Sequence, residues 1–294
     1  MKLYFKSPLL SIVFTFYLFL LLATVLLRLS LVELWILIEL VTFTFVGLRL
    51  LGSLKYGYSS QGLVTYFLLQ SGMSMLLLFR LLILPLCPPF FSILVELVLL
   101  TKLGVFPFGV WVYPILSQLS SSVLFNAMRF QKLPVFIILV ACMSFTPIVY
   151  GFVLLRLLIS GILALSSVNL LSLLIYSSIG NNSWLYLSLL GLQPTVFFSF
   201  FFIYVVGLYF VLLSSNFGAS LLSLLSLSGL PPFPLFFLKL LVVVSFFSTL
   251  VLTPAIFIIY PLLFLLSALF MRASYIRYIS TLLIFEYSSL VYVP

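Results

Sequence analysis

The sequence predicts an all-α polytopic membrane protein. Of its 294 residues, 65% are hydrophobic and 6% are charged, whereas a soluble globular domain carries about 25% charged residues. Apolar runs of about 20 residues, the length of an α-helix that crosses a bilayer, recur along the whole chain. No long polar segment lies between these runs, so we expect one integral membrane domain and no separate aqueous domain.

Charges, prolines, glycines and serine clusters divide the apolar sequence into ten or eleven predicted spanning helices. The first follows a basic N-terminus, but its apolar run is too long for a signal-peptide core and no small-residue cleavage site follows it. The last is short and carries Glu286. The predicted spans are 8–27, 31–51, 62–84, 90–117, 119–142, 147–166, 168–190, 195–214, 218–250, 254–271 and 277–293.

Two of these spans are too long and are interrupted. Span 90–117 carries Gly104-Val-Phe-Pro107-Phe-Gly109, and span 218–250 carries Gly229-Leu-Pro231-Pro232-Phe-Pro234. Proline removes a backbone donor and clashes with the preceding turn, so both helices are expected to break there. A broken helix inside a bilayer is tolerated only where protein or water meets the freed polar groups, and in transporters such breaks mark the ion path.

The breaks fall at corresponding places in the two halves of the chain. Residues 1–143 are expected to form a five-helix repeat, residues 146–272 a second one, and 273–294 a C-terminal helix, with the broken helix fourth in each repeat. Because five is odd, the second repeat is expected to be inverted in the membrane. If the N-terminus lies on the positively charged side of the membrane, six basic loop residues fall on that side and two on the opposite side. The six are Lys2, Lys6, Arg49, Lys55, Arg272 and Arg277, and the two are Arg28 and Arg80.

Half of the six lysines lie inside predicted spans, at Lys102, Lys132 and Lys239. A charge there costs about 2.5–3.5 kcal/mol on insertion scales, so such residues are functional candidates by default. Glu39 lies about nine residues into the second span and is the expected partner of Lys102. In such a pair, moving either charge changes the proton affinity of the other group. The alternatives are that the lysines snorkel to the interface and that Glu39 is a structural ion-pair partner.

The remaining polar residues are expected to be mainly structural. Glu33 is a helix-end residue, and structural pairing is the favoured interpretation of the charges at Arg80, Glu96, Arg129 and Arg156. A second polar line either holds water or acts as close-packing glue between helices. It consists of Ser71 and Ser74 with Tyr176, Ser177, Ser178, Asn181, Asn182 and Ser183.

Several classes of function are excluded. Histidine is absent, and Cys87 and Cys142 stand alone in apolar surroundings, so ligation of a metal, haem or iron–sulfur cluster is not expected. No disulfide framework is implied. The basic residues that give the net charge of +9 are scattered singly, so no nucleic-acid partner is expected.

Several segments resemble the antiporter-like subunits of respiratory complex I. The segment from Thr101 to Val112, TKLGVFPFGVWV, resembles the K-L-G-x-x-P-F-x-x-W-V segment of these subunits. Further matches, which occur in the family's order, favour the subunit 2 family of NADH–ubiquinone oxidoreductase in its shortened mitochondrial form. They are Trp35-Ile-Leu-Ile-Glu39, Tyr66-Phe-Leu-Leu-Gln70, Phe130-Gln-Lys-Leu-Pro134, Ile175 to Ile179, and Ser226 to Pro232 with Lys239 following.

The resemblance implies a non-redox, proton-translocating subunit of the membrane arm of NADH:ubiquinone reductase. It assigns Glu39, Lys102, Lys132 and Lys239 to a charged and hydrated axis. It implies no cofactor bound by this chain, with NADH, FMN, iron–sulfur clusters and ubiquinone in partner subunits. The implied partners are neighbouring membrane-arm subunits, antiporter-like ones among them, and the lipid bilayer. The implied location is the mitochondrial inner membrane, with the N-terminus on the matrix side.

The sequence departs from the family at three places. Gly109 stands where a histidine is frequent, Leu171 and Ser172 stand where a basic residue is usual, and Phe236-Phe237 replaces a Gly-Phe pair. These departures put in doubt the connection between Lys132 and Lys239. Two alternatives stay open: a free-standing cation/proton antiporter subunit of the same superfamily, and a structural spacer that moves no protons.

Overall fold

The computed structural model describes most of the chain as helices joined by short turns. The described ranges are 31–56, 61–83, 88–104, 111–118, 121–142, 147–191, 194–213, 217–249 and 254–291. The predicted span 8–27, Pro107 and the N-terminus lie outside these ranges. The chain divides into two compact units, Met1–Phe152 and Val153–Pro294.

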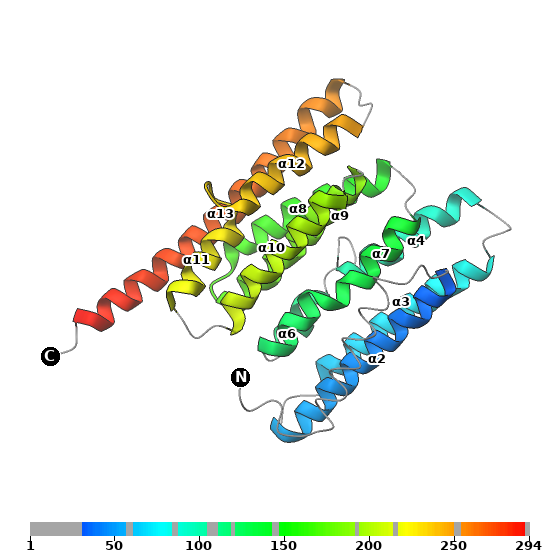
Figure 1. Cartoon of the computed structure of the whole chain (residues 1–294), viewed down its shortest axis with the longest axis horizontal. Coiled ribbons are helices and arrows are strands. Elements are labelled where there is room, and N and C mark those ends of the chain that lie inside the picture. The colour runs from blue at the N-terminus through cyan, green and yellow to red at the C-terminus, as the bar shows by residue number, and fades with distance from the viewer. Residues whose placement is uncertain are drawn as a thin grey trace. The chain divides into compact units, whose positions relative to one another are not determined.

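The described part of the first unit is a bundle in which α3 and α7 are the central packing elements (Figure 1). Helix α3 packs on α2, α4 and α5, while α7 packs on α2 and α4. Its elements are α2 (Leu31–Tyr56), α3 (Gln61–Ile83), α4 (Pro88–Leu103), α5 (Val112–Leu116), α6 (Ser121–Met128), the 3-10 turn η2 (Phe130–Lys132) and α7 (Leu133–Cys142).

The second unit is built around α9, which is buried along nearly its whole length. It packs on α10, α12 and α13. A Cβ on Gly180 of α9 would lie 2.7 Å from Met271 Cε and 2.8 Å from Ser160 Oγ, so glycine is what permits this close helix packing. The elements are α8 (Pro147–Ser166, which begins in the first unit), α9 (Leu170–Leu190), α10 (Pro194–Leu213), α11 (Phe217–Ser228), α12 (Pro234–Thr249) and α13 (Pro254–Val291).

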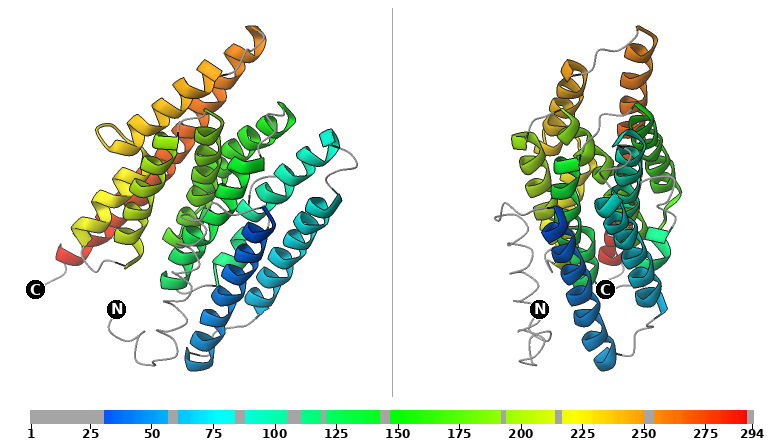
Figure 2. Two further views of the ribbon diagram at one scale, coloured as in Figure 1. Left: turned by 45° about the vertical axis from the view of Figure 1, so that its right-hand side comes forward. Right: turned by 90° about the vertical axis from the view of Figure 1, so that its right-hand side faces the viewer.

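Three segments of the described chain are long and apolar enough to cross a membrane by length and composition: Val149–Ser166, Pro194–Leu212 and Tyr260–Ile284. Shorter apolar helices accompany them, and the other expected spans stay predictions. Both predicted breaks occur. Helix α4 ends at Leu103 and α5 begins at Val112, while α11 ends at Ser228 and α12 begins at Pro234. Figure 2 shows α11 and α12 following one another along nearly one line.

The expected uninterrupted span 119–142 is wrong. The helix stops at Met128, turns at Arg129 and passes through η2 before α7 begins at Leu133. Pro134 explains the interruption, because it has no N–H to donate to the carbonyl four residues earlier and its ring crowds that carbonyl. The bond from Lys132 N–H to Arg129 O, at 3.1 Å, is accordingly of the tighter 3-10 type.

The expected separation between spans 254–271 and 277–293 is also wrong, because α13 runs without interruption from Pro254 to Val291. The predicted helix 273–294 is therefore the end of α13, within the described residues. Arg272 and Arg277, at the expected separation, do not end the helix, because each guanidinium donates to a backbone carbonyl. Arg272 Nε donates to Gly229 O, and Arg277 Nη2 donates to Ser167 O. Beyond Pro261 the helix contains no proline or glycine to interrupt it.

Candidate functional site

Lys102 lies in the last turn of α4, directly before the first break. Gly104 ends the helix in the left-handed region, at φ +76°, and its N–H donates to Thr101 O at 3.0 Å. A Cβ at Gly104 would collide with the side chain of Val112, so glycine both permits this conformation and lets α5 approach the end of α4. The side chain of Lys102 is only 5% exposed.

Lys132 lies at the second interruption of the first unit, in the 3-10 turn between α6 and α7. Its side chain is 8% exposed, and Arg129, three residues earlier, is completely buried. Arg129 lies close enough to act electrostatically on the lysine. The sequence analysis predicted a buried Lys132 in the middle of a helix; the structure buries it but places it at a helix interruption.

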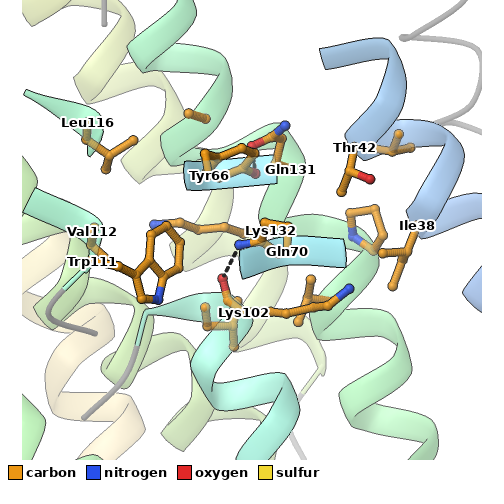
Figure 3. Close-up of a pocket in the computed structure, with 15 residues that line it drawn as sticks. Ile38, Thr42, Tyr66, Gln70, Lys102, Trp111, Val112, Leu116, Gln131 and Lys132 are labelled. Carbon is orange, nitrogen blue, oxygen red and sulfur yellow. Dashed lines mark hydrogen bonds between the residues drawn. The ribbon is translucent and has the colours of Figure 1, made fainter. Parts of the chain in front are cut away.

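Lys102 and Lys132 line the same cavity of about 30 Å³. Figure 3 shows their side chains extending in opposite directions, Lys102 toward α2 and Lys132 toward Trp111. Both ammonium nitrogens, and Gln131 Nε2, are buried without a hydrogen-bond partner among the described residues. A polar cavity needs roughly 10–15 Å³ per water molecule, so this one has room for about two. The cavity is thus able to hydrate both lysines.

Glu39 is half-buried on α2, next to Ile38, which lines the cavity. Its carboxylate lies close enough to Lys102 to act on it electrostatically. The structure therefore brings together the two residues that the sequence predicted as a pair. Glu33, six residues earlier on the same helix, is exposed, as a helix-end residue should be.

Lys239 lies in the second unit, on α12, five residues after the helix begins. Its side chain is 6% exposed, and its Nζ lies 5.9 Å from the centroid of the Trp184 ring. Gly229, at φ +71°, approaches it so closely that a Cβ there would lie 3.2 Å from Nζ. Lys239 is thus placed by the break before α12 and by the central helix α9.

Arg272, on α13, contacts the second break. Its Nε donates to Gly229 O at 3.1 Å, and its guanidinium lies 5.1 Å from the centroid of the Phe236 ring. The peptide bond between Pro231 and Pro232 is cis. The sequence analysis counted Arg272 only as a loop charge, since nothing local to it reveals the carbonyl forty-three residues away.

The other polar candidates are mostly buried. Glu96, Arg129 and Arg156 all have buried side chains, and that of Arg80 lies outside the described residues. Structural pairing of these charges stays a prediction. The serines of α9 donate to carbonyls of their own helix, for example Ser178 to Ile175 O at 2.8 Å. This self-bonding suits close helix packing.

Metal-binding clusters are absent from the described part of the chain: no group of three or more His, Cys, Asp or Glu side chains lies together there. The described residues bring together lysines, one carboxylate and neutral amide, indole and hydroxyl groups. Such a set can hold, accept and release protons, and it offers water molecules several polar partners.

Comparisons with known proteins find the same fold in a respiratory enzyme. No protein-family model matches the sequence, and no curated protein sequence matches it. Among solved structures, the chain is similar to a chain of respiratory complex I from Thermus thermophilus, determined with bound aureothin. The TM-score is 0.68 at 18% sequence identity, over 82% of this chain and 64% of that one. This chain therefore has the helical fold of that complex I chain and spans somewhat less than two thirds of its length.

Proposed function

We propose that this protein is a proton-translocating membrane-arm subunit of NADH:ubiquinone oxidoreductase. The observation that carries the proposal is the cavity of the first unit, which two buried lysines line from two helix interruptions and where Glu39 acts on one of the lysines. Ammonium groups buried this deeply need a partner, water or a function. The motifs around these same residues resemble those of the antiporter-like subunits, and the fold is that of a complex I chain.

The finer parts of the proposal follow from the family resemblance. The chain is a subunit 2 of the mitochondrial inner membrane, with its N-terminus in the matrix and its two repeats inverted. Protons pass along Glu39, Lys102, Lys132 and Lys239. NADH, FMN, the iron–sulfur clusters and ubiquinone are bound by partner subunits, so this chain has no redox centre of its own.

Proton pumping after substitution of Lys132 tests the proposal. In the intact complex reconstituted into vesicles, Lys132→Met removes the titrating group, and Lys132→Arg leaves a charge that does not release its proton. Both variants should lower the number of protons moved per NADH oxidised, while Lys55→Met, one residue before α2 ends at Tyr56, should not. A normal ratio in both Lys132 variants would refute proton transfer through this site and favour a structural spacer.

A second experiment separates this function from a free-standing antiporter. The chain is purified in mild detergent from its native membrane, and the proteins that accompany it are identified. We expect other subunits of the respiratory complex to accompany it. Isolation as a stable chain that exchanges cations for protons by itself would contradict the proposal.

A further inference from the structure

Two polar side chains of α3 reach the two interruptions that carry the cavity lysines. Tyr66 and Gln70 are four residues apart, so they lie on one face of the helix. Both are buried and both line the cavity (Figure 3). The Tyr66 hydroxyl donates to Gln131 Oε1 at 2.5 Å, and Gln70 Nε2 donates to Lys102 O at 3.5 Å.

Each of these bonds ends at a residue where an α-helix of the first unit is interrupted. Gln131 lies in the 3-10 turn immediately before Lys132, where the regular ladder of α-helical bonds is interrupted. The Lys102 carbonyl lies in the last turn of α4, and the last four carbonyls of a helix have no donor within that helix. Gln70 thus supplies a donor to a carbonyl at the end of α4, while Tyr66 donates to the side chain of the residue before Lys132.

The aromatic ring of Tyr66 adds contacts that its hydroxyl does not provide. Its centroid lies 6.0 Å from that of Trp111, where the described chain resumes after the first break, and 5.6 Å from that of Phe45 on α2. Ring packing and hydroxyl bonding can therefore be separated by experiment. Replacing tyrosine by phenylalanine keeps the ring and removes only the bond to Gln131.

We propose that Tyr66 and Gln70 are positioning residues on the two sides of one cavity: Gln70 fixes the backbone of Lys102, and Tyr66, through the Gln131 side chain, fixes the turn that carries Lys132. Tyr66 makes the more effective contact of the two, because the Gln70 contact, at 3.5 Å, is at the long limit of a hydrogen bond. The role of this clamp in proton transfer rests on the proposed function. Its role in holding the two interruptions does not.

Hydrogen–deuterium exchange in the intact complex tests the holding role. Tyr66→Phe should speed exchange of the backbone amides of residues 129–133 about fivefold, the factor expected for losing one neutral hydrogen bond. Gln70→Leu should speed exchange around Lys102 by a smaller factor. Two matched controls should leave both segments unchanged: Tyr113→Phe, an exposed tyrosine that does not line the cavity, and Ser74→Ala, whose hydroxyl bonds only its own helix. Unchanged exchange in Tyr66→Phe would overturn the proposal.

A double-mutant cycle on proton transfer tests the functional role. Gln131→Leu removes the acceptor of the Tyr66 hydroxyl and so the same bond. If the complex with Tyr66→Phe does not assemble, Gln131→Leu replaces it in the exchange experiment. Tyr66→Phe should lower the protons moved per NADH, and adding it to Gln131→Leu should lower the ratio no further. Losses that simply add would show that the two residues act separately.

The two proposals fail in different ways. If Lys132→Met lowers the proton ratio while Tyr66→Phe changes neither the ratio nor exchange, the clamp is wrong and proton transfer stands. If Lys132→Met leaves the ratio normal while Tyr66→Phe speeds local exchange, the proposed function is wrong and the clamp is structural only. If Tyr66→Phe speeds exchange but the ratio stays normal, its role in proton transfer is overturned.

Discussion

Substituting Gly229 by alanine perturbs the second break at its most constrained residue. Gly229 adopts φ +71°, a region that residues with a Cβ rarely occupy, and its missing Cβ leaves room for the Lys239 ammonium. The added methyl would lie 3.2 Å from Nζ, 3.6 Å from Cδ and 3.7 Å from Cε of that lysine. Two costs therefore arise, one in the backbone and one in the packing of the buried Lys239 side chain.

The backbone cost is the larger of the two. An L-residue in the left-handed region costs about 1–2 kcal/mol relative to glycine. The contact with Lys239 falls on the far end of a flexible side chain, which can move by a few tenths of an ångström. Such a shift weakens the contact with the Trp184 ring, whose whole value is about 0.5–2 kcal/mol. We therefore expect a destabilisation of about 1–3 kcal/mol, or several degrees in melting temperature.

Thermal unfolding in detergent, compared with Gly218→Ala, measures this cost. Gly218 lies in α11, the helix that ends at the same break, and a Cβ there would meet nothing within 4 Å. Because alanine forms helix better than glycine by about 1 kcal/mol, Gly218→Ala should keep or raise the melting temperature. In a Lys239→Met background, Gly229→Ala should still destabilise, because backbone strain does not depend on the ammonium. Equal melting temperatures for Gly229→Ala and Gly218→Ala would refute the argument.

Two further predictions concern buried polar contacts of α13. Arg272→Lys loses the Nε donor to Gly229 O and the flat contact on Phe236, so it should lower the stability of the second unit by about 1–3 kcal/mol in urea unfolding; unchanged stability would show that the break holds without it. Tyr275→Phe removes a buried 2.7 Å bond to Ser177 Oγ and should cost about 1 kcal/mol in the same assay. That cost should not grow when Ser177→Ala is added, and additive costs would contradict the contact.

The sequence predicted the two long breaks because proline and glycine act locally. A proline removes a donor wherever it lies in a helix, and a glycine next to a helix end favours the left-handed conformation found at Gly104 and Gly229. Burial of Lys102, Lys132 and Lys239 was equally predictable, because a long apolar stretch flanks each of them on at least one side. The placement of Glu39 near Lys102 was expected from the depth of Glu39 in its predicted span and from the family resemblance, which assigns the two residues to one pair.

Other features depend on residues that are distant in sequence. Pro134 lies in the interior of the predicted span 119–142, and the sequence analysis did not take this single proline as a break, because no glycine accompanies it as at the two longer breaks. The continuity of α13 through Arg272 and Arg277 depends on carbonyls of Gly229 and Ser167, which no local pattern places beside them. The clamp from Tyr66 to Gln131 joins residues sixty-five positions apart.

At both glycine breaks a backbone carbonyl accepts a hydrogen bond from a neighbouring helix, but the two donors differ in charge. The charged groups beside the two lysines differ as well. In each unit a neighbouring helix donates to a carbonyl at the break, through the neutral amide of Gln70 in the first and the charged guanidinium of Arg272 in the second. Lys102 has a carboxylate, that of Glu39, as its charged neighbour. Lys239 instead has the guanidinium of Arg272 beside it, with the Trp184 ring 5.9 Å from its Nζ. Attraction by Glu39 favours a positive charge at Lys102, whereas at Lys239 the indole face of Trp184 opposes repulsion by Arg272. The residues that donate to the two breaks therefore belong to opposite electrostatic surroundings of the two lysines.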